Sequence, residues 1–196
     1  MKEVTEMTNT KKAKKLTNSK FLNMYEIEAT RKDGTTFPYL VASRAKTETD
    51  LMAVSGKRKA DAVAIFGMYD NKLVLIKQFR YPVGDYIYEL PAGLVDAGED
   101  ALTAAKREMF EETGLEFIPD ETPWNINPWL SSPGMTDETC AVVFGKCTGT
   151  PTNANAEADE DIQVVLADKA EAIRILNEET VDVRTAFAII MAFGHN

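Results

Sequence analysis

The segment GLVDAGEDALTAAKREMFEETGL, residues 93–115, places the strongest constraint on how this chain can fold. Asp100 is a typical helix N-cap and Gly114 is a typical residue just beyond a helix end, so a helix is predicted over residues 100–113. Three apolar residues lie on one side of it, where they can pack against a sheet: Leu102, Ala105 and Met109. Three carboxylates share a different side: Glu108, Glu111 and Glu112. The fold must therefore hold a helix that is apolar on one side and acidic on another.

The rest of the chain predicts a sheet for this helix. Apolar extended runs are expected at residues 61–70, 72–80, 86–90, 139–149 and 162–167. Asp70 and Asn71 form a good tight-turn pair between the first two runs. Two further helices are expected over residues 168–179 and 182–193. Strands on either side of one helix, with helices at the end, indicate an α+β fold, an αβα sandwich with a mixed sheet.

Three segments are expected along the 196 residues, a length that suits one domain with a small appendage. Residues 1–20 are expected to be a flexible leader, residues 21–57 an antiparallel hairpin with its connection, and residues 58–196 the main domain. An isolated hairpin is marginally stable in water, and this one carries apolar side chains that need a surface to bury against. We therefore expect residues 21–57 to mediate homodimerisation.

Charge and hydropathy argue against two classes of partner. The net charge is −9, and the basic cluster KKAKK at residues 11–15 lies in a polar N-terminal tail, so no nucleic-acid interface is expected. No apolar run approaches the length of a membrane span, and no hydrophobic signal region follows the N-terminal lysines. A cytoplasmic protein without a membrane partner is expected.

The three glutamates of the helix admit two interpretations. Like charges four residues apart destabilise a helix by roughly 0.2–0.5 kcal/mol per pair, and Arg107 offsets part of this through Glu111. One interpretation is a solvated acidic face. The other is a site for a hard divalent cation, because Gly93 follows a strand and a proline and brings backbone carbonyls beside the acidic face. The sequence has no Gly-x-Ser-x-Gly elbow and no zinc-type Cys/His pattern, so water is the expected nucleophile of any hydrolysis.

Residues 93–115 resemble the signature of the Nudix hydrolases. That signature reads Gly, five residues, Glu, seven residues, then Arg-Glu-apolar-any-Glu-Glu-any-Gly-apolar, and every constrained position matches. The matching residues are Gly93, Glu99, Arg107, Glu108, Met109, Glu111, Glu112, Gly114 and Leu115. The resemblance implies the αβα sandwich of that family, and the hydrolysis of a nucleoside diphosphate linked to a further group with Mg²⁺ or Mn²⁺. It favours the metal-site interpretation of the acidic face.

The flanking segments resemble the ADP-ribose and ADP-sugar pyrophosphatases of this family. They are KQFRYPVGDYIYELPAGLVDAGE at residues 77–99, SSPGMTDET at residues 131–139, and the C-terminal part after EDIQVV. This resemblance runs from about Phe21 to the C-terminus. It implies hydrolysis of ADP-ribose to AMP and ribose 5-phosphate, and an N-terminal hairpin that serves in dimerisation and adenine contact.

The same resemblance implies a role for each site residue. The implied metal ligands are the Ala92 carbonyl and the side chains of Glu108, Glu111 and Glu112. The implied catalytic residues are Glu160, Glu112 and Arg107. The implied substrate-binding residues are Arg80, Glu89, Gly134, Arg44 and Tyr39. Glu99 and Arg107 would together orient the metal ligands, Glu160 would take a proton from water, and Tyr39 would stack on adenine with Phe21 or Tyr25 on the other side.

Some of these residues have plainer alternatives. Arg80 lies at a strand end and would also suit a surface ion pair, Tyr39 would also suit the core or an interface, and Arg44 would suit an ordinary surface position. Glu160 has three acidic neighbours, any of which could be the base: Glu157, Asp159 and Asp161. Where the animal enzymes of this group carry tryptophans in the hairpin, this chain has Tyr and Phe, which leaves the nucleobase preference open.

Two rival functions also remain open at this stage. The first is hydrolysis of another ADP-sugar, a different nucleotide sugar or a dinucleotide. The second is a Nudix-like domain that senses a nucleotide without cleaving it. Such domains usually lose glutamates from the signature, and this chain keeps all of them.

Overall fold

The structure is a computed structural model that describes residues 12–155 and 161–194. The chain divides into two compact units, each described here by itself. The N-terminal unit comprises Met1–Lys59 together with Pro128–Cys140, and the main unit comprises Ala60–Asn127 together with Ala141–Asn196. Residues 128–140, which the sequence placed in the main domain, thus belong to the N-terminal unit.

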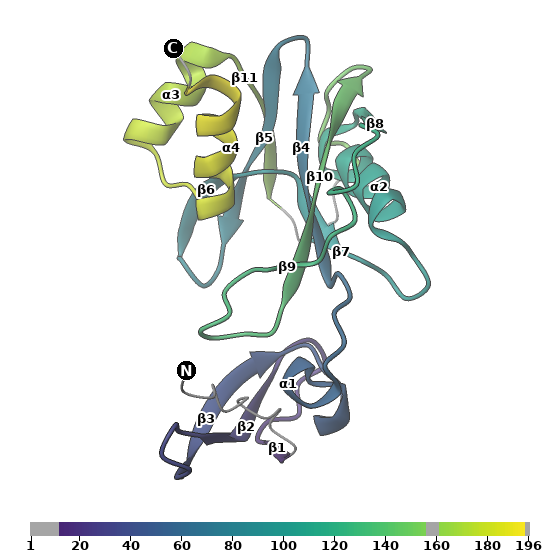
Figure 1. The fold of residues 1–196 in the computed structure, drawn as a ribbon. Helices are drawn as coiled ribbons and strands as arrows, with labels where there is room; N and C mark the ends of the chain where they lie inside the picture. Colours follow the sequence, from purple (N-terminus) through teal and green to yellow (C-terminus); the bar gives the residue numbers. More distant parts are fainter. Residues whose placement is uncertain (1–11, 156–160, 195–196) are drawn as a thin grey trace, which may run out of the picture. The chain divides into compact units, whose positions relative to one another are not determined.

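The N-terminal unit is built on a small antiparallel sheet (Figure 1). Strands β2 (Asn23–Thr30) and β3 (Thr36–Ser43) form the expected hairpin, and Gly34 in the turn has φ +85°, a conformation that favours glycine. A third strand, β1 (Ala13–Lys15), pairs with β2. Residues 13–15 therefore extend the sheet, although the sequence placed them in the leader. The short helices η1 (Glu48–Asp50) and α1 (Met52–Ser55) complete this part of the unit.

Residues 128–140 are tied to the N-terminal unit by hydrogen bonds to β3 and α1. The Ala42 amide donates to the Met135 carbonyl at 3.0 Å, and the Met52 amide donates to Asp137 Oδ2 at 3.0 Å. Strand β9 (Trp129–Leu130) lies in this segment and pairs with the first residues of β10. These bonds join groups far apart in sequence, which explains why composition alone did not indicate them.

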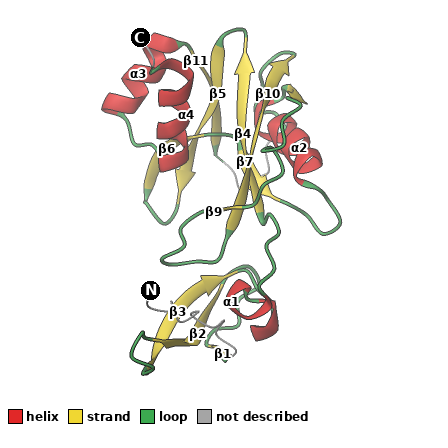
Figure 2. Cartoon of the chain, viewed as in Figure 1, coloured by secondary structure: helices red, strands yellow, loops and turns green. Residues whose placement is uncertain are grey.

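The main unit contains most of the larger sheet, which has eight strands among the described residues. The path runs β11-β5-β4-β10-β8, while β6 pairs with β5 and β7 with β4. The bounds are β4 (Ala62–Tyr69), β5 (Lys72–Arg80), β6 (Asp85–Glu89), β7 (Ala92–Leu94), β8 (Glu116–Pro119), β10 (Thr139–Thr148) and β11 (Ile162–Ala167). Figure 2 draws β4 and β10 in the same direction, whereas the neighbouring pairs are antiparallel. The sheet is therefore mixed, as predicted.

Three helices pack against this sheet. Helix α2 (Ala101–Thr113) contacts β4, β7 and β8. Helices α3 (Lys169–Glu178) and α4 (Val183–Phe193) lie on the other side of the sheet in Figure 1. The apolar side of α2 is buried in a core shared with β4, β5 and β10: Val63, Ile65, Val74, Ala104, Ala105, Met109, Ala141 and Val143. The predicted αβα sandwich of α+β class is confirmed.

Local signals set the ends of these elements. Asp100 Oδ1 accepts from the Thr103 amide at 2.8 Å, and Gly114 ends helix α2 with φ +69°, as expected for its two caps. Asp70 and Asn71 have φ of +46° and +61°, which suits the two-residue turn predicted between β4 and β5. No helix in the described part of the chain is long and apolar enough to cross a membrane.

Candidate active site

The site begins where helix α2 packs on the short strand β7. Glu112, whose exposed fraction is only 1%, turns its carboxylate toward the strand, and Oε2 accepts a hydrogen bond from the Ala92 amide at 3.0 Å. Ala92 is itself fixed by pairing with Ala64 of β4. A buried carboxylate is costly unless hydrogen bonds stabilise it, so this contact joins the helix and the strand at one defined place.

Gly93 leaves room for the second glutamate. A Cβ atom built on Gly93 would overlap the carboxyl group of Glu108, so the side chain of Glu108 lies directly against the Gly93 backbone. Position 93 therefore requires glycine, because a side chain there would collide with the Glu108 carboxylate. This explains why the signature begins with a glycine. Glu108 and Glu112 both lie against the Ala92–Gly93 peptide segment.

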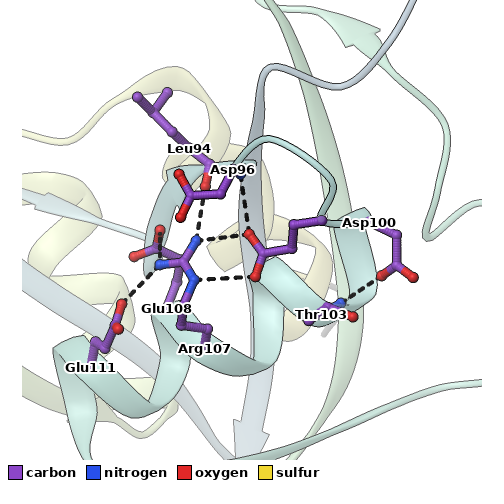
Figure 3. Close-up of polar contacts among 8 residues, drawn as sticks. Leu94, Asp96, Asp100, Thr103, Arg107, Glu108 and Glu111 are labelled. Carbon is purple, nitrogen blue, oxygen red and sulfur yellow. Dashed lines mark hydrogen bonds and ion pairs between the residues drawn. The ribbon is translucent and has the colours of Figure 1, made fainter.

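Arg107 organises the acidic face of α2 (Figure 3). Its Nη1 donates to Glu108 Oε1 at 2.8 Å and to Glu111 Oε2 at 2.9 Å. Its Nε and Nη2 donate to the two carboxylate oxygens of Glu99 at 3.2 and 3.0 Å, and Nη2 also donates to the Leu94 carbonyl at 3.0 Å. One guanidinium thus bridges the helix, the loop before it and the end of β7.

These bonds shift the ionisation of both partners. The hydrogen bonds from Arg107 hold the pKa of the Glu99 carboxyl below its usual range, with a smaller contribution from the Asp96 amide. The hydrogen bonds to Glu99, with further contributions from Glu108 and Glu111, raise the pKa of the Arg107 guanidinium. Arg107 therefore stays charged and offsets the like-charge repulsion on α2 more fully than its single contact with Glu111, expected from the sequence, could do.

The expected metal ligands Glu108, Glu111 and Glu112 lie on one face of α2, and Glu108 and Glu112 also lie against the Ala92–Gly93 segment. Among residues 12–155 and 161–194, however, no three His, Cys, Asp or Glu side chains converge closely enough to hold a metal ion. Arg107 Nη1 lies between Glu108 and Glu111, which is one reason their carboxylates do not close on a common point. The donor set consists of oxygen atoms, which is the chemistry that hard divalent cations prefer.

Two expected substrate residues lie on adjacent strands. Arg80 at the end of β5 donates through Nε to Glu89 Oε2 at the end of β6. Glu89 is buried, whereas the Arg80 side chain is 38% exposed. The bond to Glu89 uses Nε, and the Nη nitrogens of the Arg80 guanidinium take no part in it. Arg80 therefore forms an ion pair, which was the plainer alternative for this residue, and the pair also fixes the position of its side chain.

The candidate base Glu160 lies outside the described residues, as do its neighbours Glu157 and Asp159. The segments around them are held by polar contacts. The Thr152 amide donates to the Thr113 carbonyl at 2.8 Å, and the Tyr86 hydroxyl donates to Asp161 Oδ2. Asp161, one of the alternative bases, is therefore bound to a tyrosine of β6, a contact that no local sequence signal indicated.

The remaining expected residues belong to the N-terminal unit and not to the unit that carries α2. The Tyr39 hydroxyl donates to the Gly134 carbonyl at 2.8 Å, so these two residues lie together. Arg44 pairs with Glu138 at 2.8 Å. Tyr25 is completely buried and its hydroxyl donates to the Ala45 carbonyl, which does not suit the second stacking position on adenine that was expected of Phe21 or Tyr25. Phe21 is 64% exposed.

Comparison with known proteins supports the sequence signature. The model of the family described as NUDIX domain matches residues 58–186. A protein named methanol dehydrogenase activator, from Bacillus methanolicus, is 33% identical over 135 residues, which cover 67% of this chain and 71% of that protein. A protein named ADP-ribose pyrophosphatase, from Bacillus subtilis, is 31% identical over 131 residues, which cover 65% of this chain and 69% of that protein.

Solved structures give the same fold. One described as an ADP compounds hydrolase has a TM-score of 0.64 to this chain, at 18% identity, covering 92% of this chain and 89% of its own. At that identity the likeness concerns the fold alone. The family model, the relatives above 30% identity and the signature on helix α2 all point to one assignment: the chain belongs to the Nudix family of hydrolases.

Proposed function

We propose that this protein hydrolyses the diphosphate bond of ADP-ribose, with Mg²⁺ or Mn²⁺, to AMP and ribose 5-phosphate. The observation that carries the proposal is the acidic face of α2, on which Arg107 holds Glu108 and Glu111 while Glu112 is anchored to the Ala92 amide. The name of the Bacillus subtilis relative, ADP-ribose pyrophosphatase, supports the choice of substrate. A mouse protein named ADP-sugar pyrophosphatase, 39% identical over 74 residues that cover 35% of this chain and 34% of that protein, supports the substrate class.

The all-oxygen donor set fits a hard divalent cation. Glu108, Glu111, Glu112 and the Ala92 carbonyl are the groups that would hold it. When bound, such a cation would neutralise the diphosphate and lower the pKa of a water molecule. The role of Arg107 and Glu99 is to fix the orientation of these carboxylates, since Arg107 contacts two of them and Glu99 holds its guanidinium from the other side.

The other residues of the proposed mechanism act on the substrate and on water. Arg80 presents its terminal nitrogens to the diphosphate while Glu89 holds its Nε, an arrangement that orients the charge before substrate arrives. Glu160 takes a proton from the attacking water while the water oxygen bonds in line to one phosphorus. The bond from that phosphorus to the bridging oxygen breaks, and the bridging oxygen leaves with the other phosphate. Gly134, Arg44 and Tyr39 are further proposed substrate contacts, with Tyr39 stacking on adenine.

The name of the Bacillus methanolicus relative raises a second candidate within the enzyme class. That name refers to a dehydrogenase, and nicotinamide dinucleotides are common hydride carriers of enzymes, so a dinucleotide belongs among the substrates to be tested. A purely sensory domain is disfavoured, because every glutamate of the signature is present and three of them are held by Arg107. We further propose a cytoplasmic homodimer that assembles through residues 21–57.

A substrate panel tests the proposal. Purified protein with Mg²⁺ is incubated with ADP-ribose, ADP-glucose, UDP-glucose and NADH, and release of nucleoside monophosphate is measured. ADP-ribose should give the highest kcat/KM, with AMP and ribose 5-phosphate in equal amounts and none without a divalent cation. Glu112→Gln protein prepared in parallel controls for contaminating activity. A higher kcat/KM for NADH would favour the dinucleotide alternative, and no release from any substrate would favour the sensory one.

A further inference from the structure

Gln78 of β5 is a buried polar residue that the proposed mechanism does not use. The exposed fraction of Gln78 is 7%, and its Oε1 has no hydrogen-bond partner among the described residues. Among those residues it is the sole buried side-chain nitrogen or oxygen without such a partner. Buried acceptors in native proteins nearly always have a donor. An acceptor without a donor among the described residues of the ligand-free chain points to a donor that arrives with a ligand.

The strand pairing shows which face of the sheet Gln78 occupies. Residues two apart on a strand share a face, so Gln78 lies on the same face as Val74, which packs in the core with α2. Directly paired residues also share a face, and Ile76 pairs with Glu89 of β6. Gln78 therefore lies on the face that carries Arg80, Glu89 and the acidic helix.

The side chains paired with Gln78 offer its Oε1 no hydrogen-bond donor. Its paired residues are Ile87 on β6 and Ile162 on β11, both buried and apolar. Arg80, the next residue on the same face, uses Nε for Glu89. A phosphate oxygen or a carboxylate would repel a carbonyl oxygen, so the missing partner must be a donor.

We infer that Gln78 is a ligand-binding residue whose Oε1 accepts an O–H group delivered with the substrate complex. The inference rests on the proposed function, which brings two sources of such a donor to this face. One is a hydroxyl of the sugar attached to the diphosphate that Arg80 holds, and the other is a water molecule carried on the divalent cation. The unpaired oxygen destabilises the ligand-free protein, and a hydrogen bond from the bound O–H group would remove this destabilisation.

The test replaces Gln78 by methionine, which has similar length and no acceptor of comparable strength. The probes are the analogues of ADP-ribose and of ADP in which methylene replaces the bridging diphosphate oxygen, each with Mg²⁺, and Mn²⁺ alone. Affinities are measured by calorimetry, and the melting temperature of the ligand-free protein is recorded. Gln163→Met is the matched control, because Gln163 is an exposed glutamine of β11 next to Ile162.

Gln78→Met should melt about 2–4 °C higher than wild type without ligand, because an unpaired buried oxygen is removed. It should also lose about 3- to 10-fold in affinity for one probe. A loss for the ADP-ribose analogue alone identifies the sugar hydroxyl, and a loss for Mn²⁺ identifies the water; both outcomes support the inference. Gln163→Met should change neither quantity.

Three outcomes would overturn the inference: a lower melting temperature, unchanged affinity for all probes, or an equal loss for both nucleotides with unchanged Mn²⁺ affinity. The first indicates that Gln78 is already satisfied inside the fold, and the third indicates altered packing. Failure of the proposed function looks different, because wild-type protein would then not bind the ADP-ribose analogue at all.

Discussion

At the scale of single residues, substitution of Glu112 distinguishes most clearly between a catalytic and a structural role for the acidic face of α2. Glu112→Gln keeps an oxygen that can accept from the Ala92 amide and removes the charge proposed to hold a cation. Because a bound cation supplies several kcal/mol of transition-state stabilisation, we expect kcat for ADP-ribose to fall by more than about 100-fold while the protein stays folded. Steady-state kinetics and a thermal melt measure the two effects.

The control for this variant is Glu116→Gln, since Glu116 is exposed on β8 just beyond the helix. It should retain wild-type kcat. Near-wild-type turnover of Glu112→Gln would rule out the metal-site interpretation and leave the acidic face as a solvated surface braced by Arg107.

The base is a second prediction at this scale. Glu160→Gln keeps the size of the side chain and removes the proton acceptor, and general-base catalysis is typically worth about 100- to 10,000-fold. We expect kcat to fall within that range and KM to change little. Glu157→Gln and Asp159→Asn are the matched controls and should stay within a few-fold of wild type. A large loss in one of these controls instead would move the base to that neighbour.

Individual site residues were predictable from the sequence where spacing along one helix determines them. Glu108, Glu111 and Glu112 share a face because of helix geometry alone. The signature identified Gly93 as a constrained position but did not explain why glycine is needed there. The reason is the approach of Glu108 to its backbone, which depends on tertiary packing. Partners across strands or loops, such as Glu89 for Arg80 and Asp161 for Tyr86, leave no periodic signal and could not be found in this way.

At the scale of elements, the junction of β7 and α2 depends on the absence of a side chain at position 93. Gly93→Ala would place a methyl group where the Glu108 carboxylate lies. The end of a glutamate side chain can move, so we expect only a small change in melting temperature. A displacement of about 1 Å in a reacting group can lower the rate about 100-fold, and we expect kcat to fall accordingly. Wild-type kcat in this variant would mean that Glu108 need not lie against Gly93.

The elements themselves were predicted well where local chemistry defines them. Helix α2 begins after Asp100 and ends before Gly114, because an aspartate cap and a left-handed glycine act within one turn. Strand β1 and the attachment of residues 128–140 to the N-terminal unit were not predicted. Both depend on backbone hydrogen bonds between segments distant in sequence, and β1 is too short to show a periodic pattern.

At the scale of the whole molecule, the apolar surface of the N-terminal unit bears on assembly. Four large apolar residues of the hairpin segment are exposed within the single chain: Phe21, Leu22, Tyr39 and Leu40. Phe21 and Leu22 precede β2, and Tyr39 and Leu40 are consecutive residues of β3. Exposed apolar side chains that form a contiguous patch are typical of protein–protein contacts. This surface supports the proposal that residues 21–57 mediate a homodimer, which the sequence suggested from the marginal stability of an isolated hairpin.

The last prediction tests that dimer. Wild-type protein should scatter light as a particle of twice the 21.7 kDa of one chain at micromolar concentration. Leu40 is 54% exposed on β3 and lies opposite Glu26, so Leu40→Glu adds a charge beside a like charge and should shift the protein to monomer. Ile118→Glu, at a 57% exposed position of β8, is the control and should remain dimeric. Because the adenine contact is proposed on the same segment, the monomeric variant should show a higher KM for ADP-ribose with a smaller change in kcat. A wild-type monomer at all concentrations would exclude the dimer, and the hairpin would then need another partner for its apolar surface.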